Sequence, residues 1–185
     1  SYWRTLNDKR ERPYTFYDVK RFCPKPNRIM DIKEVEQLIS LCHEDVAEVS
    51  KKAEVFTLVE YIVGLRKFSG RAEKNGRVKE NFVGTLEDKL AIFSIHLLSM
   101  ANAYNMDLHA LTIDKKLCRC FNYEDLIKGM LKVVMSQYNI HKKIIVLLGM
   151  LFCYCLRANI DIVYYIKKRL EIGGAYGRNV CNGTC

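Results

Sequence analysis

Proline is scarce in this chain of 185 residues and is missing altogether after position 26. The three prolines are Pro13, Pro24 and Pro26. Because proline removes a backbone donor and restricts the residue before it, we expect residues 1–30 to form an extended arm. The proline-free stretch permits uninterrupted helices, and the pair Gly173-Gly174 ends the last of them. We therefore expect a helical domain over 31–172 and an irregular tail over 173–185.

Long hydrophobic runs are also missing. The longest, Ile144–Leu156, has thirteen residues, too few to cross a bilayer. The first four residues, Ser1-Tyr2-Trp3-Arg4, are polar and basic, unlike a secretory signal. We therefore expect an intracellular protein, cytoplasmic or mitochondrial, with no membrane span and with free thiols.

Complete catalytic motifs are absent as well. The sequence contains neither Gly-x-Ser-x-Gly nor His-Glu-x-x-His, and the glycines between positions 64 and 84 fit no phosphate-binding or dinucleotide motif. Cys118-Arg119-Cys120 and the pair Cys181 and Cys185 have atypical spacing for zinc, so unpaired thiols are expected. We predict a protein without cofactor or metal, and lean against an enzyme.

Positive charge is what the chain has in excess, with 30 Lys and Arg against 21 Asp and Glu, a net charge of +9. Such a surplus attracts polyanions, since each cation placed on a phosphate releases counterions. RNA or a nucleoprotein assembly is the expected partner; a merely solvated surplus of lysine is the alternative.

The cations gather in two segments. In the arm they alternate with aromatic residues, a pattern suited to bases and phosphates, although the rings are equally suited to packing on the protein itself. The second segment, 64–84, is predicted to be a flexible basic loop. The candidate nucleic-acid-binding residues are Arg4, Lys9, Arg10, Arg12, Lys20, Arg21, Lys25, Arg28, Arg66, Lys67, Arg71, Lys74 and Arg77.

Apolar residues recur at helical spacing from residue 31 onward, which predicts an all-α helical bundle. Candidate N-caps are Asp31, Thr85, Asn122 and Asp161. The expected helices cover 31–52, 53–67, a helix that Thr85 caps and that is strongly apolar over 90–104, then 107–117, 123–138, 141–157 and 161–171.

Two stretches 54 residues apart resemble each other. Each has a long apolar helix, a turn through Asn-Met-Asp or Asn-Ile-Asp, and a short helix. They begin at Lys89 and Lys143. A duplicated helical hairpin is one explanation; two unrelated hairpins with similar patterning is the other.

The segment Leu41–Val49, with Asp45 and Glu48 three residues apart, and the segment Leu90–Leu108 resemble the all-α nucleotide pyrophosphohydrolases, the MazG-like and dimeric-dUTPase-like group. The resemblance implies a helical fold in which two carboxylate pairs hold magnesium on a triphosphate. It also implies that such a bundle forms dimers, so a homo-oligomer is compatible with the sequence.

The second carboxylate pair of that family is missing. When the first motif is aligned with Asp45 and Glu48, the positions of the second pair fall on Lys89 and Ile92. In the second of the two similar stretches, which we call the internal echo, the same positions are Lys143 and Val146. An ammonium group repels magnesium, and an aliphatic side chain offers no oxygen ligand. We therefore predict a non-catalytic basic binding or structural protein, a subunit or adaptor of an RNA-containing or multi-protein assembly.

Two alternatives remain open from the sequence. One is a magnesium-dependent nucleoside triphosphate pyrophosphohydrolase that uses Glu44, Asp45 and Glu48 with further carboxylates. The other is a pure protein-interaction module, such as a viral helical bundle that binds a helix of a host protein.

Overall fold

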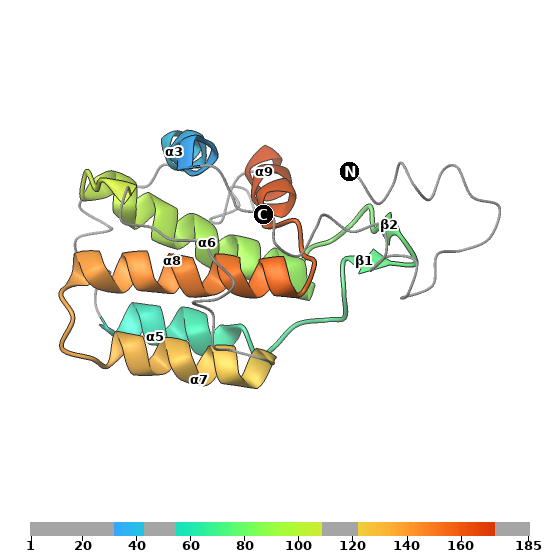
Figure 1. Ribbon diagram of the computed structural model, residues 1–185. Helices are drawn as coiled ribbons and strands as arrows, with labels where there is room; N and C mark the ends of the chain where they lie inside the picture. The colour runs from blue at the N-terminus through green and yellow to red at the C-terminus, as the bar shows by residue number, and fades with distance from the viewer. Residues whose placement is uncertain (1–31, 43–54, 109–121, 173–185) are drawn as a thin grey trace.

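The computed structural model describes residues 32–42, 55–108 and 122–172. Within these ranges the chain forms six helices and one two-stranded sheet, which confirms the predicted all-α bundle (Figure 1). The elements are α3 (Ile32–Leu41), α5 (Val55–Gly64), β1 (Glu73–Lys74), β2 (Arg77–Val78), α6 (Leu86–Ala103), α7 (Tyr123–Val134), α8 (Ile140–Arg157) and α9 (Ile162–Glu171). The predicted arm and tail lie outside the described residues, as does the helix expected over 107–117 apart from its first two positions.

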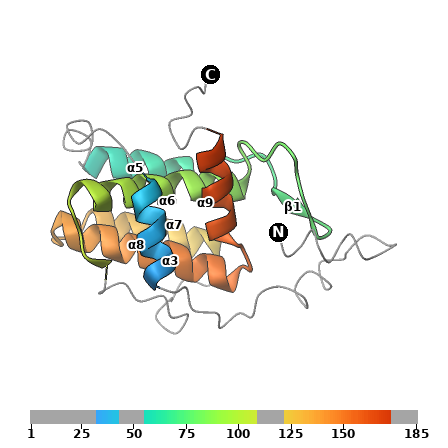
Figure 2. The same ribbon diagram turned by 90° about the horizontal axis from the view of Figure 1, so that it is seen from above.

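Four helices form a ring, in the order α5, α6, α8 and α7, in which each packs against its two neighbours. Helices α3 and α9 pack on α6 from outside the ring. Seen from above, both cross over α6 and α8 (Figure 2). No single helix in the described ranges is long and apolar enough to cross a membrane; α8 and α9 together have the length and composition, but a bend of 111° separates them.

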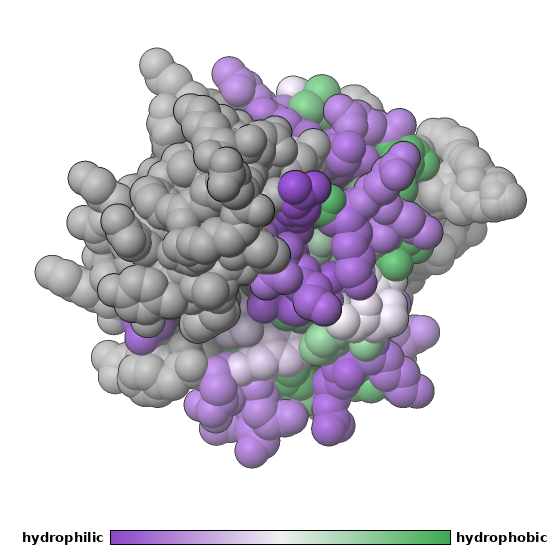
Figure 3. All heavy atoms as spheres, turned by 90° about the vertical axis from the view of Figure 1, so that its right-hand side faces the viewer, coloured by the Kyte–Doolittle hydropathy of each residue, from purple (hydrophilic) through white to green (hydrophobic). Residues whose placement is uncertain are grey.

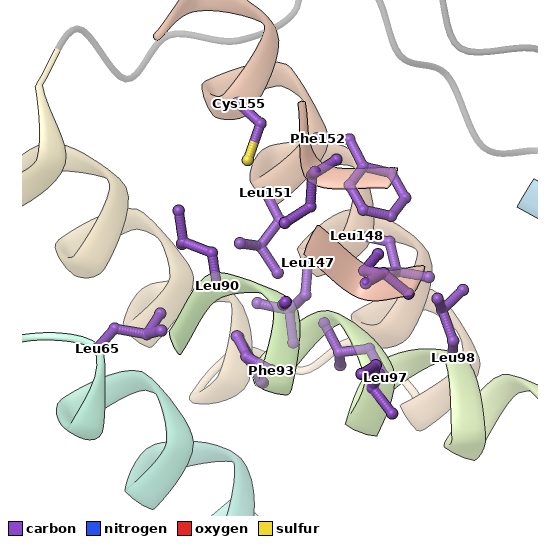
Figure 4. Close-up of a cluster of buried hydrophobic side chains, with 14 of the residues drawn as sticks. Leu65, Leu90, Phe93, Leu97, Leu98, Leu147, Leu148, Leu151, Phe152 and Cys155 are labelled. Atoms are coloured by element: carbon purple, nitrogen blue, oxygen red, sulfur yellow. The ribbon is translucent and has the colours of Figure 1, made fainter. Parts of the chain in front are cut away.

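The core lies between α6 and α8. Leu90, Phe93 and Leu97 of α6 meet Leu147 and Leu151 of α8, and all five are fully buried (Figure 4). Helix α6 is buried on almost every side because helices cover it both from the ring and from above. This explains why its apolar residues do not keep to one stripe, as they would on a surface helix.

The predicted caps are confirmed where they are described. The side chains of Thr85, Asn122 and Asp161 accept hydrogen bonds from the backbone N–H groups three residues later, at 3.4, 2.8 and 3.3 Å. Each satisfies a donor that a helix start leaves unpaired. Asn139 caps α8 in the same way.

The internal echo is present in the backbone. Helices α6 and α8 both have 18 residues, and their caps Thr85 and Asn139 are 54 positions apart. Beyond each helix the chain turns through an asparagine with positive φ, 52° at Asn105 and 57° at Asn159. The next amide closes the turn in both copies, from Met106 to Ala101 at 2.9 Å and from Ile160 to Cys155 at 2.8 Å. Helices α6 and α8 therefore share their cap and the geometry of the turn that follows, at the spacing expected from the sequence.

Three helix boundaries differ from those expected. The prediction of a continuous helix over 31–52 is wrong at Cys42, because α3 ends at Leu41. The Cys42 carbonyl accepts a hydrogen bond of 2.9 Å from the Asn102 side chain, whereas in a continuous helix it would accept one from a backbone amide of the next turn. The helix over 123–138 ends at Val134, because the Ser136 hydroxyl binds the Val133 carbonyl at 2.6 Å. The helix over 53–67 ends at Gly64.

Candidate functional site

Residues 66–84, which we call the basic hairpin, contain the two short paired strands β1 and β2, so the prediction that 64–84 is a loop without secondary structure is wrong. Strands β1 and β2 pair antiparallel across the turn Asn75-Gly76. Both turn residues have positive φ, 53° and 77°. This is the conformation of a two-residue hairpin turn, which Asn-Gly adopts readily.

The ends of the basic hairpin are joined by backbone hydrogen bonds. The Ser69 amide donates to the Gly84 carbonyl at 2.9 Å, and the Leu86 amide donates to the Gly70 carbonyl at 3.0 Å. Further along, the Lys79 amide donates to the Ala72 carbonyl at 2.8 Å. The hairpin therefore projects from the start of α6 as one closed unit.

Glu87 attaches the basic hairpin to the bundle. Its side chain is 1% exposed and accepts three hydrogen bonds: from the Ala72 amide at 2.7 Å, from the Glu73 amide at 3.4 Å and from Arg71 Nε at 2.9 Å. A buried carboxylate is stable only when donors or cations surround it. The first turn of α6 therefore fixes where β1 lies.

Two cations face each other at the tip of the hairpin. The register pairs Lys74 directly with Arg77, and both are exposed. Like charges directly opposite on neighbouring strands destabilise the pair. An anion bound between the two would remove this repulsion. Hydrophilic side chains predominate over the described surface at this end of the molecule (Figure 3).

The other cations of the hairpin differ in what they contact. Arg71 is paired with Glu87, and Arg66 lies 3.8 Å from Glu124 in an exposed ion pair, which contributes little. Lys67 and Lys79 are exposed. The candidate residues of this segment thus divide into one structural cation, Arg71, and a set at the surface.

Glu73 adds little negative charge to the hairpin at neutral pH. Burial, and then the neighbouring Glu87 carboxylate, raise its pKa from 4.5 to about 8, against the opposing effects of Arg71 and of the hydrogen bond from the Tyr165 hydroxyl at 3.5 Å. Below that pH the group is mostly neutral. The positive charge of the hairpin is therefore not offset at this position.

This shift predicts that the protein becomes less stable as the pH rises from 4.5 to about 8. In that window an unfolded chain releases the proton of Glu73 while the folded protein keeps it, so the free energy of unfolding falls, by roughly 2 kcal/mol after allowance for solvent screening. Glu73→Gln should remove this part of the pH dependence of the free energy of unfolding, and near pH 8 the variant should be more stable than the unmodified protein. Urea denaturation across the window measures both; parallel pH profiles for the two proteins would contradict the assignment.

Asp88 holds the other side of the same helix start. Its carboxylate is 1% exposed, accepts a hydrogen bond of 2.7 Å from the Gly84 amide and lies 3.4 Å from Arg169 Nη1 on α9. Burial raises its pKa, and the Gly84 hydrogen bond and Arg169 act against that rise. Adjacent acidic residues therefore fasten two different elements, the hairpin and α9, to α6.

A pocket of about 420 Å³ lies between α5 and α6, next to the residues that lead into the basic hairpin. Its described lining is Thr57, Glu60, Tyr61, Gly64, Leu65, Lys89 and Ile92. The Tyr61 ring is stacked on His96 at 4.3 Å and on Phe93 at 5.7 Å between centroids, which holds it in place. The pocket thus has an aromatic wall together with one acidic and one basic side chain.

The two positions that replace the expected second carboxylate pair, Lys89 and Ile92, both line this pocket. Their equivalents Lys143 and Val146 lie half-buried on α8. No group of three or more His, Cys, Asp or Glu side chains in the described ranges is arranged to hold a metal ion. Glu44, Asp45 and Glu48, like the cations of the arm between Arg4 and Arg28, lie outside the described residues.

Comparison with known proteins found no match among protein-family models, curated proteins or solved structures. The resemblance to the pyrophosphohydrolases therefore stays a prediction. What the geometry defines is an all-α bundle with a basic hairpin hydrogen-bonded to the start of α6 and an adjacent pocket.

Proposed function

We propose that this protein is a non-catalytic RNA-binding subunit of a ribonucleoprotein or multi-protein assembly, and that the basic hairpin is its main described contact with RNA. The observation that carries the proposal is the cross-strand pair of Lys74 and Arg77 at the tip of a hairpin that is hydrogen-bonded to Glu87. Two exposed cations on paired strands lie close enough to interact with the same phosphate or with neighbouring phosphates, which favours binding of a polyanion.

Three further features support binding rather than catalysis. The net charge of +9 favours a polyanion over a neutral partner. The hairpin is joined to α6 by the hydrogen bonds of Glu87 to Arg71, Ala72 and Glu73, which should lower the entropic cost of association. The two positions of the pocket where the pyrophosphohydrolases have their second carboxylate pair are Lys89 and Ile92.

Neutralising the tip tests the proposal. Lys74→Gln/Arg77→Gln removes two charges and the repulsion between them, so the variant should fold at least as stably as the original protein. Its affinity for single-stranded RNA at low salt should fall about tenfold, because two phosphate contacts are lost. Fluorescence anisotropy with a labelled oligonucleotide measures the affinity.

The matched control is Lys128→Gln/Lys132→Gln, which removes the same charge from two exposed positions on α7. It should change the affinity less than threefold. Equal losses in both variants would mean that only net charge matters, and the assignment to the hairpin would be wrong. Magnesium-dependent release of pyrophosphate from dUTP by the unmodified protein would contradict the non-catalytic part.

A further inference from the structure

The pocket between α5 and α6 has two charged side chains in its lining, the exposed Glu60 and the half-buried Lys89. Within the described part of the chain, no hydrogen bond or ion pair engages the carboxylate of Glu60 or the ammonium group of Lys89, although both line the pocket. Its volume of about 420 Å³ is that of a typical small-ligand site. A ligand that suits it has both donors and acceptors at its edge.

The lining also favours a flat ligand. The stacking of Tyr61 on His96 and Phe93 fixes an aromatic ring at the wall, and Leu65 and Ile92 supply apolar surface. Gly64 leaves the space open, because a Cβ atom added there would meet nothing within 4 Å. Unpaired bases of RNA are commonly bound in this way, against aromatic and apolar side chains and by their edges.

The position of the pocket connects it to the basic hairpin. Its residues Gly64 and Leu65 run directly into Arg66 and Lys67, both exposed. A strand whose phosphates follow those cations would have its bases beside the opening. The base that enters can then be selected by two charged side chains, Glu60 at the exposed edge of the pocket and the half-buried Lys89.

We propose that this pocket binds an unpaired guanine base of the RNA strand held by the basic hairpin. Guanine presents two adjacent N–H donors on its Watson–Crick edge, which match the two oxygens of the Glu60 carboxylate. Its carbonyl oxygen is an acceptor for Lys89, as in other contacts of lysine with guanine. Uracil offers one N–H donor and cannot make the paired contact. This inference rests on the proposed function, since the strand brings the base to the pocket.

The test compares two labelled hexanucleotides, one of uridine alone and one with a single guanosine among uridines. The unmodified protein should bind the guanosine-containing strand about tenfold more tightly, the discrimination expected from one bidentate contact. Glu60→Gln should reduce that ratio to less than twofold, because an amide cannot accept both hydrogen bonds. Gly64→Phe, which fills the pocket, should do the same.

Two further variants separate this inference from the proposed function. Gly64→Ala adds only a methyl group to open space and should keep the ratio, which controls for the helix itself. Lys74→Gln/Arg77→Gln should weaken both strands equally and keep the ratio. Equal affinity of the unmodified protein for both strands, or a ratio that survives in Glu60→Gln, would overturn the pocket assignment alone. Failure of both strands to bind would overturn the RNA-binding function and the pocket with it.

Discussion

Glu87→Ala is expected to lower the free energy of unfolding by about 4 kcal/mol, the largest effect of any single change that we predict. The substitution leaves the buried amide of Ala72 without its partner at 2.7 Å and removes the acceptor of Arg71. An unsatisfied buried donor costs about 1–3 kcal/mol, and loss of one member of a buried ion pair adds to that. The lost ion pair with Arg71 contributes less to this free energy than a fully buried pair would, because the Arg71 side chain is 45% exposed and solvent screens the interaction.

The same change should release the basic hairpin. Amide hydrogen exchange at Lys79, whose N–H binds the Ala72 carbonyl, should become much faster, and the affinity for RNA should fall with it. Glu80→Ala, an exposed change on the same hairpin, should alter stability by less than about 0.5 kcal/mol. Unchanged exchange at Lys79 in Glu87→Ala would show that the carboxylate does not hold the hairpin.

Arg169→Met should cost about 3 kcal/mol, because it leaves the Asp88 carboxylate buried without its cation. The loss should grow as the pH rises above the pKa of an unfolded Asp, since burial then opposes ionisation with less compensation. Chemical denaturation at several pH values measures this.

Two variants make that result specific. Lys168→Met changes the neighbouring residue, whose partner Glu171 is exposed, and should have almost no effect. The double variant Asp88→Asn/Arg169→Met should recover much of the stability, because the neutral amide still accepts the Gly84 hydrogen bond. If Arg169→Met were as stable as Lys168→Met, the ion pair would have no structural importance.

Local signals in the sequence are sufficient for the helix starts. Thr85, Asn122 and Asp161 cap helices because a cap depends only on residues within one turn. The repeat with a spacing of 54 residues could be recognised for the same reason, because the conformation of a turn such as that at Asn105 depends on the residues next to it in sequence.

The basic hairpin was missed because its strands are short and charged. Asn75-Gly76 is a strong turn signal, but Glu73, Lys74 and Arg77 give no alternation of apolar and polar residues. Glu87, whose carboxylate accepts hydrogen bonds from the Ala72 and Glu73 amides, is 15 and 14 residues away from them in sequence, so the contact is not visible in any local pattern.

The sequence predicts the residues that α6 contributes to the pocket but not those that α5 contributes. Lys89 and Ile92 share a helix face by their spacing, and the sequence identified both as positions where oxygen ligands are missing. Glu60 and Tyr61 come from α5, and nothing in the local pattern shows that they lie opposite. Only the packing of α5 against α6 brings the four together.

The salt dependence of RNA binding tests the central claim most directly. The logarithm of the binding constant should fall linearly with the logarithm of salt concentration, and for single-stranded RNA the slope should be smaller by about 1.4 in Lys74→Gln/Arg77→Gln than in the unmodified protein, since two phosphate contacts are gone. The slope of Lys128→Gln/Lys132→Gln should match that of the unmodified protein. A slope near zero for the unmodified protein, or identical slopes in both double variants, would contradict binding through the basic hairpin.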